Sequence, residues 1–509
     1  MKTCLLIGLL VASFALANTG CSGGEPAKPN IIIILADDLG YGDTGPYGQE
    51  KIETPNIDRL AEGGMRFTRH YAGSAVCAPS RCVLLTGMHT GHAQVRGNDE
   101  WAERGEVWSY RAMIADSTLE GQKPLAEGTQ TIASLLQKKG YVTGAVGKWG
   151  LGAPHTEGRP GSQGFDFFYG YNCQRMAHTY YPVHLWRNSS RVWLGNDTVA
   201  PHTGFGPGED PYDPASYERF NMRDYSPELM FREMISFIDS CGPNPFFLYW
   251  ATPIPHLALQ APDEWVRRYV DKFGEEEPYT GEEGYFPVRY PHATYAAMIS
   301  YLDDQIGRLV SHLKELGIYD NTLILFTSDN GPAWNAGTDP EWFRSATPFR
   351  GGYGYGKGFL HEGGIRVPMI AFWPGVIRAG GVSDHLSAFQ DILPTLCDIT
   401  GTELPQGTDG LSFLPELKGG KQQQHEYLYW EFPEYGGQQA VMIGNMKALR
   451  RDIHKGNERF ELFDLAADPQ EMHDLAAENP ELIKRVSAIV EKEHRSSQNP
   501  RWRFGLMDN

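Results

Sequence analysis

The chain has 509 residues, which is too long for one compact core and predicts two domains. With 41% hydrophobic and 21% charged residues, its composition is that of an ordinary globular protein. The formal net charge is −18 and no long basic run offsets it, so a nucleic-acid partner is not expected.

The N-terminus has the features of an export signal. Lys2 supplies a positive end, and residues 5–16 form an apolar run that is too short to span a membrane. Ala15-Leu16-Ala17 fits a cleavage site with small residues. Thr19-Gly20-Cys21 resembles a bacterial lipoprotein site, at which Cys21 would carry lipid, although Asn18 stands where such sites usually have an apolar residue. We therefore expect an exported protein, which is periplasmic, held at the outer membrane by this lipid, or secreted.

The cysteine count argues against a disulfide scaffold. Of the seven cysteines, Cys4 lies in the predicted signal and Cys21 is the candidate lipid site. An odd number remains, so at least one thiol is outside any internal disulfide. The spacings fit no zinc site. These remaining cysteines are Cys77, Cys82, Cys173, Cys241 and Cys397.

Strand-like and helix-like segments alternate along most of the chain, which predicts a mostly parallel sheet covered by helices on both faces. Ser226 is a candidate N-cap for one of the helices. In chain order, we predict a strand over 31–36, helices over 56–62 and 131–139, a strand over 141–146, a helix over 227–239, a strand over 246–251, a helix over 295–316, and strands over 322–327 and 367–373.

The composition and pattern of the sequence change after Leu417. Residues 419–424 are polar and linker-like, and the segments beyond them predict a small antiparallel sheet with one helix. The strands are expected over 427–432, 439–443 and 447–451, and the helix over 480–493. The predicted boundaries are therefore a signal peptide over 1–20, a tether over 21–29, a catalytic domain over 30–417 and a C-terminal α+β subdomain over 418–509.

Two polar pairs directly follow predicted buried strands. Asp37-Asp38 come after the first strand, and Asp329-Asn330 come after the strand over 322–327. Sites in open α/β sheets lie beyond the carboxyl ends of strands, so the two pairs can converge. Their oxygen atoms suit a hard cation, Ca²⁺ ahead of Mg²⁺. The alternative is that both pairs only form turns, in which Asp and Asn are common.

The segment from Cys77 to Arg81 is more specific. Pro79 favours the first turn of a helix, so Cys77 is expected at a helix N-terminus, where N–H groups stabilise an anion. Arg81 follows one helical turn later. The alternatives are a buried, inert cysteine and a thiolate nucleophile.

These residues, Cys77-Ala78-Pro79-Ser80-Arg81 followed by Leu85-Thr86-Gly87, resemble the signature of the type I sulfatases, the formylglycine-dependent and arylsulfatase-like branch of the alkaline-phosphatase superfamily. The resemblance extends over nearly the whole mature chain. Further motifs in the family's order are Asp37-Asp38, Gly147-Lys148-Trp149, Pro253 to His256, Asp329-Asn330-Gly331, Lys357, Glu362 to Arg366, Phe460 to Leu465, Asp468-Pro469 and Glu471.

The resemblance implies a fold, a cofactor and roles for single residues. It implies the alkaline-phosphatase-like α/β sheet between helices, with the smaller C-terminal α+β part. A dedicated formylglycine-generating enzyme would oxidise Cys77, and a hydroxyl of the hydrated aldehyde would attack sulfur. Ca²⁺ would be held by Asp37, Asp38, Asp329, Asn330 and residue 77. Lys148 and Lys357 would bind sulfate oxygens, Arg81 would bond the diol, and His256 would protonate the leaving group.

One position departs from the family pattern. Many members have a histidine two residues after the Lys148 position, and that histidine contacts the diol; here the residue is Gly150. His155, His89 and His92 are candidates to replace it. The other interpretation is that the second step of the reaction, in which the diol expels sulfate and the aldehyde is restored, is weak or altered.

The substrate is predicted less sharply than the chemistry. Polar and aromatic loops, among them the stretch from Gln174 to Tyr181, suit sugar hydroxyls and ring faces, although aromatic residues also pack domains together. We expect a sulfated carbohydrate, with an aryl sulfate as the alternative. Expected substrate-binding residues are Asn98, Arg175, His178 and Arg350. Competing functions are a phosphatase or phosphonate monoester hydrolase of the same superfamily, and a non-catalytic lipoprotein that binds sulfated glycans.

Overall fold

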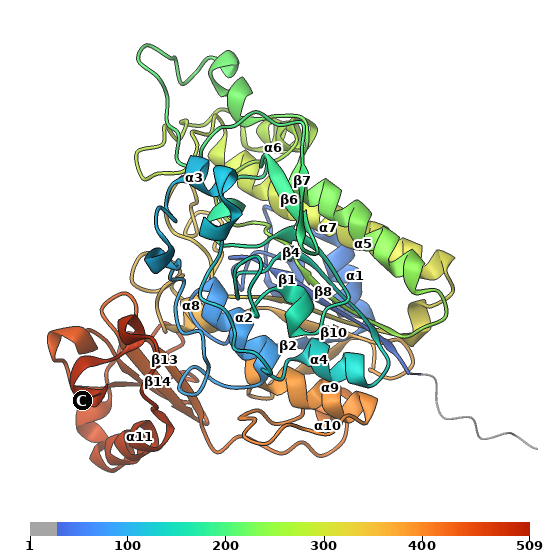
Figure 1. The fold of residues 1–509 in the computed structure, drawn as a ribbon. Coiled ribbons are helices and arrows are strands. Elements are labelled where there is room, and N and C mark those ends of the chain that lie inside the picture. Colours follow the sequence, from blue (N-terminus) through green and yellow to red (C-terminus); the bar gives the residue numbers. More distant parts are fainter. Residues whose placement is uncertain (1–27, 509) are drawn as a thin grey trace, which may run out of the picture.

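A computed structural model describes residues 28–508 of the chain, so the expected signal and lipid site lie outside the described residues. A ten-stranded sheet forms the centre, in the order β11-β2-β10-β9-β1-β8-β4-β5-β6-β7 (Figure 1). Its strands are β1 (Asn30–Ala36), β2 (Met65–Phe67), β4 (Val142–Lys148), β5 (Phe167–Tyr171), β6 (His184–Arg187), β7 (Ser190–Trp193), β8 (Phe246–Ala251), β9 (Thr322–Ser328), β10 (Met369–Phe372) and β11 (Gly381–Ser383). A separate pair joins β3 (His70–Tyr71) to β12 (Ser387–Ala388).

Helices cover both faces of the sheet because side chains alternate along its buried strands. Ile32 and Ile34 of β1 share a core with α1, α5 and α7, whereas Ile31 and Ile33 pack with α2, α4 and α9. Figure 1 shows the two helix layers on opposite sides of the strands. The helices are α1 (Pro55–Gly63), α2 (Cys77–Thr86), α3 (Tyr110–Ala115), α4 (Ile132–Lys138), α5 (Ser226–Cys241), α6 (Asp263–Phe273), α7 (Pro291–Glu315), α8 (Glu362–Ile365), α9 (Ile392–Thr400) and α10 (Leu414–Leu417).

The strands at the centre of the sheet are parallel. β1 pairs in parallel with β8 and β9, and β4 pairs in parallel with β8 and β5. β10, β6 and β7 are antiparallel to their neighbours towards the edges. The carboxyl ends of the parallel strands therefore meet along one edge, and the segments after β1, β4, β8 and β9 lie side by side there.

The C-terminal part is a four-stranded antiparallel sheet of β13 (Leu428–Phe432), β14 (Gln438–Ile443), β15 (Met446–Arg450) and β16 (Glu461–Asp464). One face packs against α11 (Pro480–Glu493). The other face packs on Tyr71, Leu360 and Ile365 of the larger part, so the two sheets form one body (Figure 1). The predicted fold class, a mostly parallel sheet between helices with a smaller α+β part, is confirmed.

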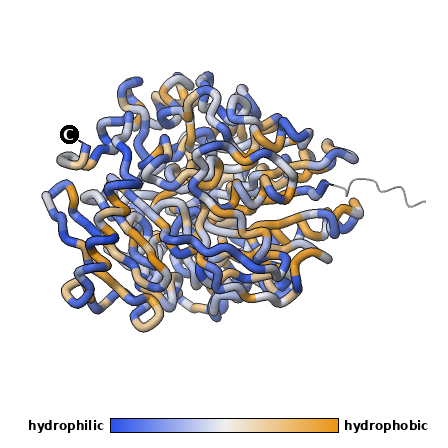
Figure 2. The backbone as a smooth tube through the Cα atoms, turned by 90° about the horizontal axis from the view of Figure 1, so that it is seen from below, coloured by the Kyte–Doolittle hydropathy of each residue, from blue (hydrophilic) through white to orange (hydrophobic). Residues whose placement is uncertain are grey.

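Hydrophobic residues run through the interior, and hydrophilic ones prevail in the outer loops (Figure 2). One helix cap was predicted wrongly: Ser226 is the first residue of α5 and Tyr225 is the N-cap, because the Ser226 hydroxyl bonds the Tyr171 hydroxyl at 2.7 Å instead of a helix N–H. All five cysteines of the described chain are buried free thiols. Among residues 28–508, no helix combines the length and apolar character needed to span a membrane.

Candidate active site

Cys77 is the first residue of α2 and is fully buried. The N-cap, Val76, has no side chain that can bond the first N–H groups of the helix, and Pro79 in the first turn has no N–H. The Asn98 side chain takes over part of this role, since its Oδ1 accepts the Ala78 N–H at 2.8 Å. The Cys77 side chain is thereby fixed at the helix start, at the carboxyl edge of the sheet.

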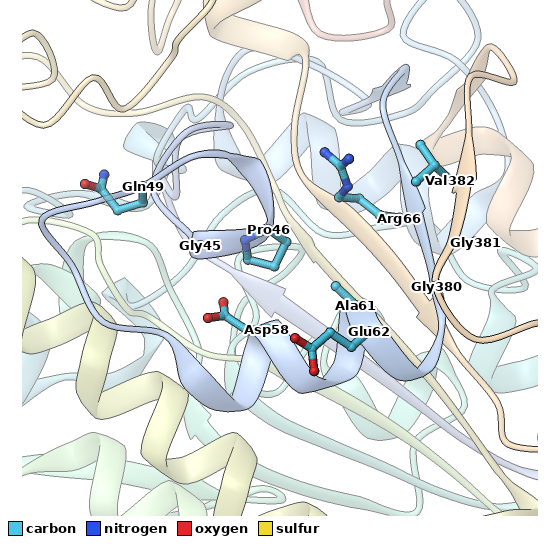
Figure 3. Close-up of a pocket in the computed structure, with 10 residues that line it drawn as sticks. All are labelled: Gly45, Pro46, Gln49, Asp58, Ala61, Glu62, Arg66, Gly380, Gly381 and Val382. Carbon is cyan, nitrogen blue, oxygen red and sulfur yellow. The ribbon is translucent and has the colours of Figure 1, made fainter.

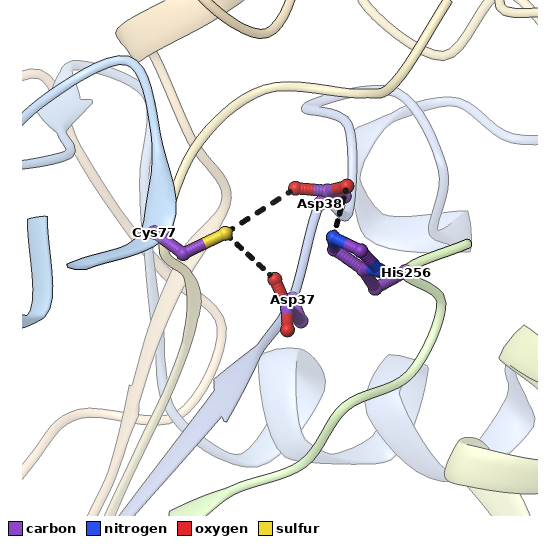
Figure 4. Close-up of side chains that lie close together, drawn as sticks. All are labelled: Asp37, Asp38, Cys77 and His256. Atoms are coloured by element: carbon purple, nitrogen blue, oxygen red, sulfur yellow. Dashed lines mark hydrogen bonds and ion pairs between the residues drawn. The ribbon is translucent and has the colours of Figure 1, made fainter. Parts of the chain in front are cut away.

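Two carboxylates and a histidine surround the thiol (Figure 4). The Cys77 thiol donates to Asp37 Oδ1 at 3.2 Å and lies 4.0 Å from Asp38 Oδ1. His256 Nε2 lies 3.7 Å from Asp38 Oδ2. One ligand atom from each of these four side chains lies within 4.8 Å of the others, so the group has the spacing of a metal site.

The pair after β9 joins the same cluster. Asp329 Oδ1 accepts the Asp38 N–H at 3.1 Å, and Asn330 Nδ2 donates to Asp38 Oδ1 at 2.8 Å. Asn330 Oδ1 is buried and has no hydrogen-bond partner in the described structure. The two acidic pairs, which are nearly 300 residues apart in sequence, therefore converge as predicted from the strand ends.

Each carboxylate of the cluster is paired with a cation, and two of these cations, Arg81 and Lys148, are fully buried. Arg81 donates from Nε and Nη2 to Asp329 Oδ2, at 3.0 and 2.7 Å. Lys148 Nζ lies 2.6 Å from Asp37 Oδ2 and 3.5 Å from the Cys77 sulfur. Lys357 Nζ lies 2.7 Å from Asp38 Oδ2, and its side chain is 18% exposed. All predicted catalytic and metal-ligating residues thus meet around position 77.

Burial makes the ionisation of this cluster unusual. Burial raises the pKa of Asp37, but the charges of Lys148, His256 and Arg81 outweigh it and hold the pKa well below its usual range. Burial and the Asp37 charge raise the pKa of Asp329 to about 7. The Asp329 carboxyl is therefore harder to ionise beside the Asp37 carboxylate, and a divalent cation would relieve this repulsion.

The thiol itself is a poor nucleophile here. Burial, followed by the charges of Asp329 and Asp37, raises the pKa of Cys77 well above its ordinary value. A thiolate is therefore disfavoured despite the helix N-terminus. This argues against the interpretation of Cys77 as the nucleophile of a thiol enzyme.

His256 is held in one orientation. Its Nδ1 bonds the Leu257 carbonyl oxygen, so Nδ1 carries the proton and Nε2 faces Asp38. Burial, Lys357 and Lys148 lower the pKa of His256 to about 4. The ring is therefore neutral at pH 7 in this state, with a free lone pair towards the cluster.

The four predicted substrate-binding residues separate in the structure. The His178 ring stacks on that of His256, with 5.4 Å between ring centroids. Arg175 lies over the ring of Trp108, Asn98 bonds the start of α2, and Arg350 Nη2 donates to the Glu471 carbonyl oxygen in the C-terminal part. Only His178 of this set is in direct contact with a predicted catalytic side chain.

Gly150 has φ +75°, and a Cβ on it would lie 2.0 Å from Gln174 Nε2. The Gln174 amide therefore occupies the volume that a side chain at position 150 would need. The suggested replacements are engaged elsewhere: His155 is exposed near Trp186, and His89 and His92 bond carboxylates of Asp409 and Glu493. None of the three histidines takes the place of the missing one.

Two further side chains at the site were missed from the sequence. His202 Nε2 lies 3.1 Å from His178 Nδ1, and the Tyr285 ring lies 5.1 Å from the His178 ring. Both have positive φ and lie in loops with no motif. Their only signal was the density of histidine and tyrosine in polar loops, which is too common to single them out.

A surface pocket of about 480 Å³ lies elsewhere, between α1 and the β2–β11 edge (Figure 3). Asp58, Glu62 and Arg66 supply its charged side chains. None of the predicted site residues lines it, so it has no part in the chemistry around Cys77.

The chain is similar to known enzymes over almost its full length. The model of the Sulfatase family matches residues 29–402, and that of the N-sulphoglucosamine sulphohydrolase C-terminal domain matches residues 351–498. Human arylsulfatase A is 32% identical, over 91% of this chain and 87% of the relative. Human N-acetylgalactosamine-6-sulfatase is 29% identical, over 92% and 86%. The crystal structure of Ps i-CgsB in complex with k-i-k-neocarrahexaose is 28% identical and superposes with a TM-score of 0.72, covering 92% of this chain and 94% of that chain.

The sheet order and the cluster at its carboxyl edge define an enzyme of the alkaline-phosphatase superfamily fold. Within that class, the family match over most of the residues is decisive. The chain belongs to the sulfatase family and is a sulfuric ester hydrolase.

Proposed function

We propose that the protein hydrolyses sulfate monoesters of carbohydrates, with a formylglycine made from Cys77 as nucleophile and Ca²⁺ as metal. The observation that carries the proposal is the position of the Cys77 sulfur, 3.2 Å from Asp37 Oδ1 and 3.5 Å from Lys148 Nζ at the start of α2. This sulfur marks where an oxygen of the hydrated formylglycine would lie. Formylglycine supplies a hydroxyl of the hydrated aldehyde as the nucleophile.

The residues present fit a hard divalent cation. Asp37, Asp38, Asp329 and Asn330 offer oxygen ligands, and the unpartnered Asn330 Oδ1 is free to bind. The raised pKa of Asp329 reflects the crowding of carboxylates that a cation would balance. Ca²⁺ bound there would draw electron density from the nucleophile and from the sulfate.

The chain's own cations hold the sulfate. A metal on the carboxylates would free Lys148 and Lys357 from their ion pairs, and both ammonium groups would then bind sulfate oxygens and stabilise the charge that develops on them. Arg81 donates two hydrogen bonds to Asp329 Oδ2, which fix this carboxyl group and favour its ionised form. The sulfate's negative charge raises the pKa of His256, whose Nε2 then donates a proton to the leaving oxygen.

Modification of Cys77 must precede folding. Its side chain has no exposure in the folded protein, so an oxidising enzyme has no access to it. We therefore propose that a formylglycine-generating enzyme acts on the unfolded segment around residues 77–81. This agrees with export of the chain, proposed from the features of residues 1–21, with Cys21 lipidation as the alternative to cleavage.

The carbohydrate is supported by the relatives and by the polar wall of the site. One relative is named an N-acetylgalactosamine-6-sulfatase, and one solved structure holds a neocarrahexaose. In this chain, His178, His202 and Tyr285 stand beside His256, where they can bond hydroxyls and stack on a ring face.

Two measurements test the proposal. The mass of the tryptic peptide from His70 to Arg81, taken from protein made in its native host, should show formylglycine; an intact thiol would refute the nucleophile. Values of kcat/KM on sulfate esters should exceed those on matched phosphate and phosphonate esters, and the reverse order would establish the phosphatase alternative. Binding of sulfated glycan without turnover would support the non-catalytic lipoprotein instead. Removal of Ca²⁺ with a chelator should abolish turnover, and addition of Ca²⁺ should restore it.

A further inference from the structure

The turn η5 (Arg175–His178), with Gln174 before it, borders the active site at both ends. At its far end, the His178 ring stacks on His256. At its near end, the Gln174 amide fills the place of a side chain on Gly150, two residues after Lys148. The Trp149 N–H donates to the Tyr171 carbonyl oxygen and the Gly150 N–H to the Asn172 carbonyl oxygen, so β4 stays joined to the segment after β5 as far as Gly150, two residues beyond Lys148.

Several buried polar atoms around Gln174 have no hydrogen-bond partner in the described structure. They are Gln174 Nε2 and Oε1 and Asn172 Oδ1, and beside them the Gln122 amide lies within reach of the Glu100 carboxyl. Their residues are all buried, with relative exposures of 1–5%. Polar groups in protein interiors are almost always paired, so the unpaired atoms of Gln174 and Asn172 indicate a ligand or bound water.

Direct contacts hold these residues together. The Gln174 N–H donates to Gln122 Oε1, and the Arg175 N–H donates to Glu100 Oε1, both at 3.3 Å. The backbones of Glu100 and Gln122 pair as an isolated bridge. The unpaired atoms therefore belong to one group, fixed by its backbone beside the sulfate-binding edge.

The chemistry of the group selects a neutral, hydroxylated ligand. Amide N–H groups of Gln174 and Gln122 can donate, and the oxygens of Gln174 and Asn172 can accept. Burial raises the pKa of Glu100 to about 7, so this carboxyl can serve as donor or acceptor. An anion would face several oxygen atoms, and an apolar ring would leave the polar groups unpaired. A sugar hydroxyl both donates and accepts, and suits the group.

We propose that Gln174, Gln122, Asn172 and Glu100 form a subsite that binds ring hydroxyls of the sulfated sugar. The subsite determines that the substrate is a carbohydrate rather than an aryl sulfate. It rests on the proposed function, because the sugar is held here only while its sulfate lies at Lys148 and Lys357.

The test compares two substrates in the Gln174→Ala variant. Galactose 6-sulfate and N-acetylglucosamine 6-sulfate carry ring hydroxyls, whereas 4-nitrophenyl sulfate carries none. We expect kcat/KM on the better sugar sulfate to fall about 10- to 100-fold, since two hydrogen bonds are lost and their partners stay unpaired. On 4-nitrophenyl sulfate it should fall less than about threefold.

Gln305→Ala is the matched control. Gln305 is a buried glutamine on α7 whose Oε1 also has no partner in the described structure, and its Nε2 donates to the Pro227 carbonyl oxygen at 3.0 Å. Its loss should lower stability and change kcat/KM equally on both substrates. As a second variant, Gln122→Ala removes another amide of the group and should reproduce the selective loss on the sugar.

A binding measurement separates the subsite from catalysis. In the Cys77→Ala background, Gln174→Ala should weaken binding of galactose 6-sulfate or N-acetylglucosamine 6-sulfate in calorimetry, but not of inorganic sulfate. Equal losses on sugar and aryl substrates, or no loss on the sugar, would overturn the subsite and indicate bound water only. If the wild type hydrolyses 4-nitrophenyl sulfate and neither binds nor cleaves the sugar sulfates, the subsite fails while sulfatase activity stands. If it hydrolyses no sulfate ester, the proposed function fails and the subsite with it.

Discussion

Lys148 offers a test in which metal binding and catalysis change in opposite directions. Its Nζ lies 2.6 Å from Asp37 Oδ2, and both side chains are fully buried. If Asp37 is a metal ligand, Lys148 and the cation compete for the same carboxylate. Lys148→Met keeps the length of the side chain and removes its charge. Asp37 remains within 3.3 Å of Arg81, so the variant should still fold.

The magnitude follows from the ion pair that the metal must break. A buried, charge-assisted hydrogen bond contributes about 1.5–3 kcal/mol net. Without that competitor, the affinity of the metal-free protein for Ca²⁺ should rise about 10- to 100-fold. Turnover should fall by about 10²- to 10³-fold, because a cation that stabilises sulfate oxygens in the transition state is lost.

The assay is a calorimetric titration of chelator-treated protein with Ca²⁺, followed by turnover of 4-nitrophenyl sulfate on the same samples. Lys272→Met serves as control, because Lys272 forms an exposed ion pair with Glu53 at 3.1 Å and should change neither quantity. Weaker Ca²⁺ binding in Lys148→Met, or full activity, would refute the competition between Lys148 and the metal for Asp37.

Three further predictions concern stability. Arg81→Met leaves the buried Asp329 without the two hydrogen bonds to its Oδ2, so the free energy of unfolding should fall by about 3–5 kcal/mol in urea titrations; a loss below about 1 kcal/mol would contradict this. Lys447→Met should cost a similar amount, about 3–5 kcal/mol, because Lys447 lies 2.9 Å from the buried Glu362, and the loss should shrink at low pH as carboxyls protonate. Burial lowers the pKa of His70 to about 3. The contribution of the neutral ring to the free energy of unfolding is therefore complete above about pH 6.5 and is lost as the pH falls towards 3. Between pH 7 and pH 5 the free energy of unfolding of the wild type should fall by about 2 kcal/mol more than that of His70→Gln, and equal pH profiles of the two proteins would refute this prediction.

The sequence predicts the centre of the fold well because the signals there are local. The β-branched run of β1 and the apolar runs of β8 and β9 favour buried strands, and the polar pairs follow the ends of β1 and β9. Pro79 predicts a helix start near Cys77, and α2 begins at Cys77. The helix α11 has the predicted bounds, Pro480–Glu493.

The features that could not be predicted depend on contacts between distant segments. Asn98 Oδ1 accepts the Ala78 N–H at the start of α2, because this N–H needs an acceptor that Val76 cannot supply. Arg350 turns to the Glu471 carbonyl oxygen, a partner 121 residues away. The replacement for a side chain at Gly150 comes from Gln174, which no spacing rule connects to it. Tertiary packing determines such pairings, and the local sequence pattern around each residue does not indicate them.

The charge balance of the cluster explains how an acidic protein can bind an anion. The molecule carries a net charge of −18, but salt screens charges that lie more than about 8–10 Å away. At short range each buried carboxylate lies beside a cation, so the metal-free cluster is close to neutral. A Ca²⁺ ion would bring it to a net positive charge, and a sulfate ester would then be attracted only to the metal-loaded site. The residues in this balance are Asp37, Asp38 and Asp329 against Arg81, Lys148 and Lys357. Metal binding should therefore precede substrate binding, and chelator-treated protein should show no measurable affinity for inorganic sulfate.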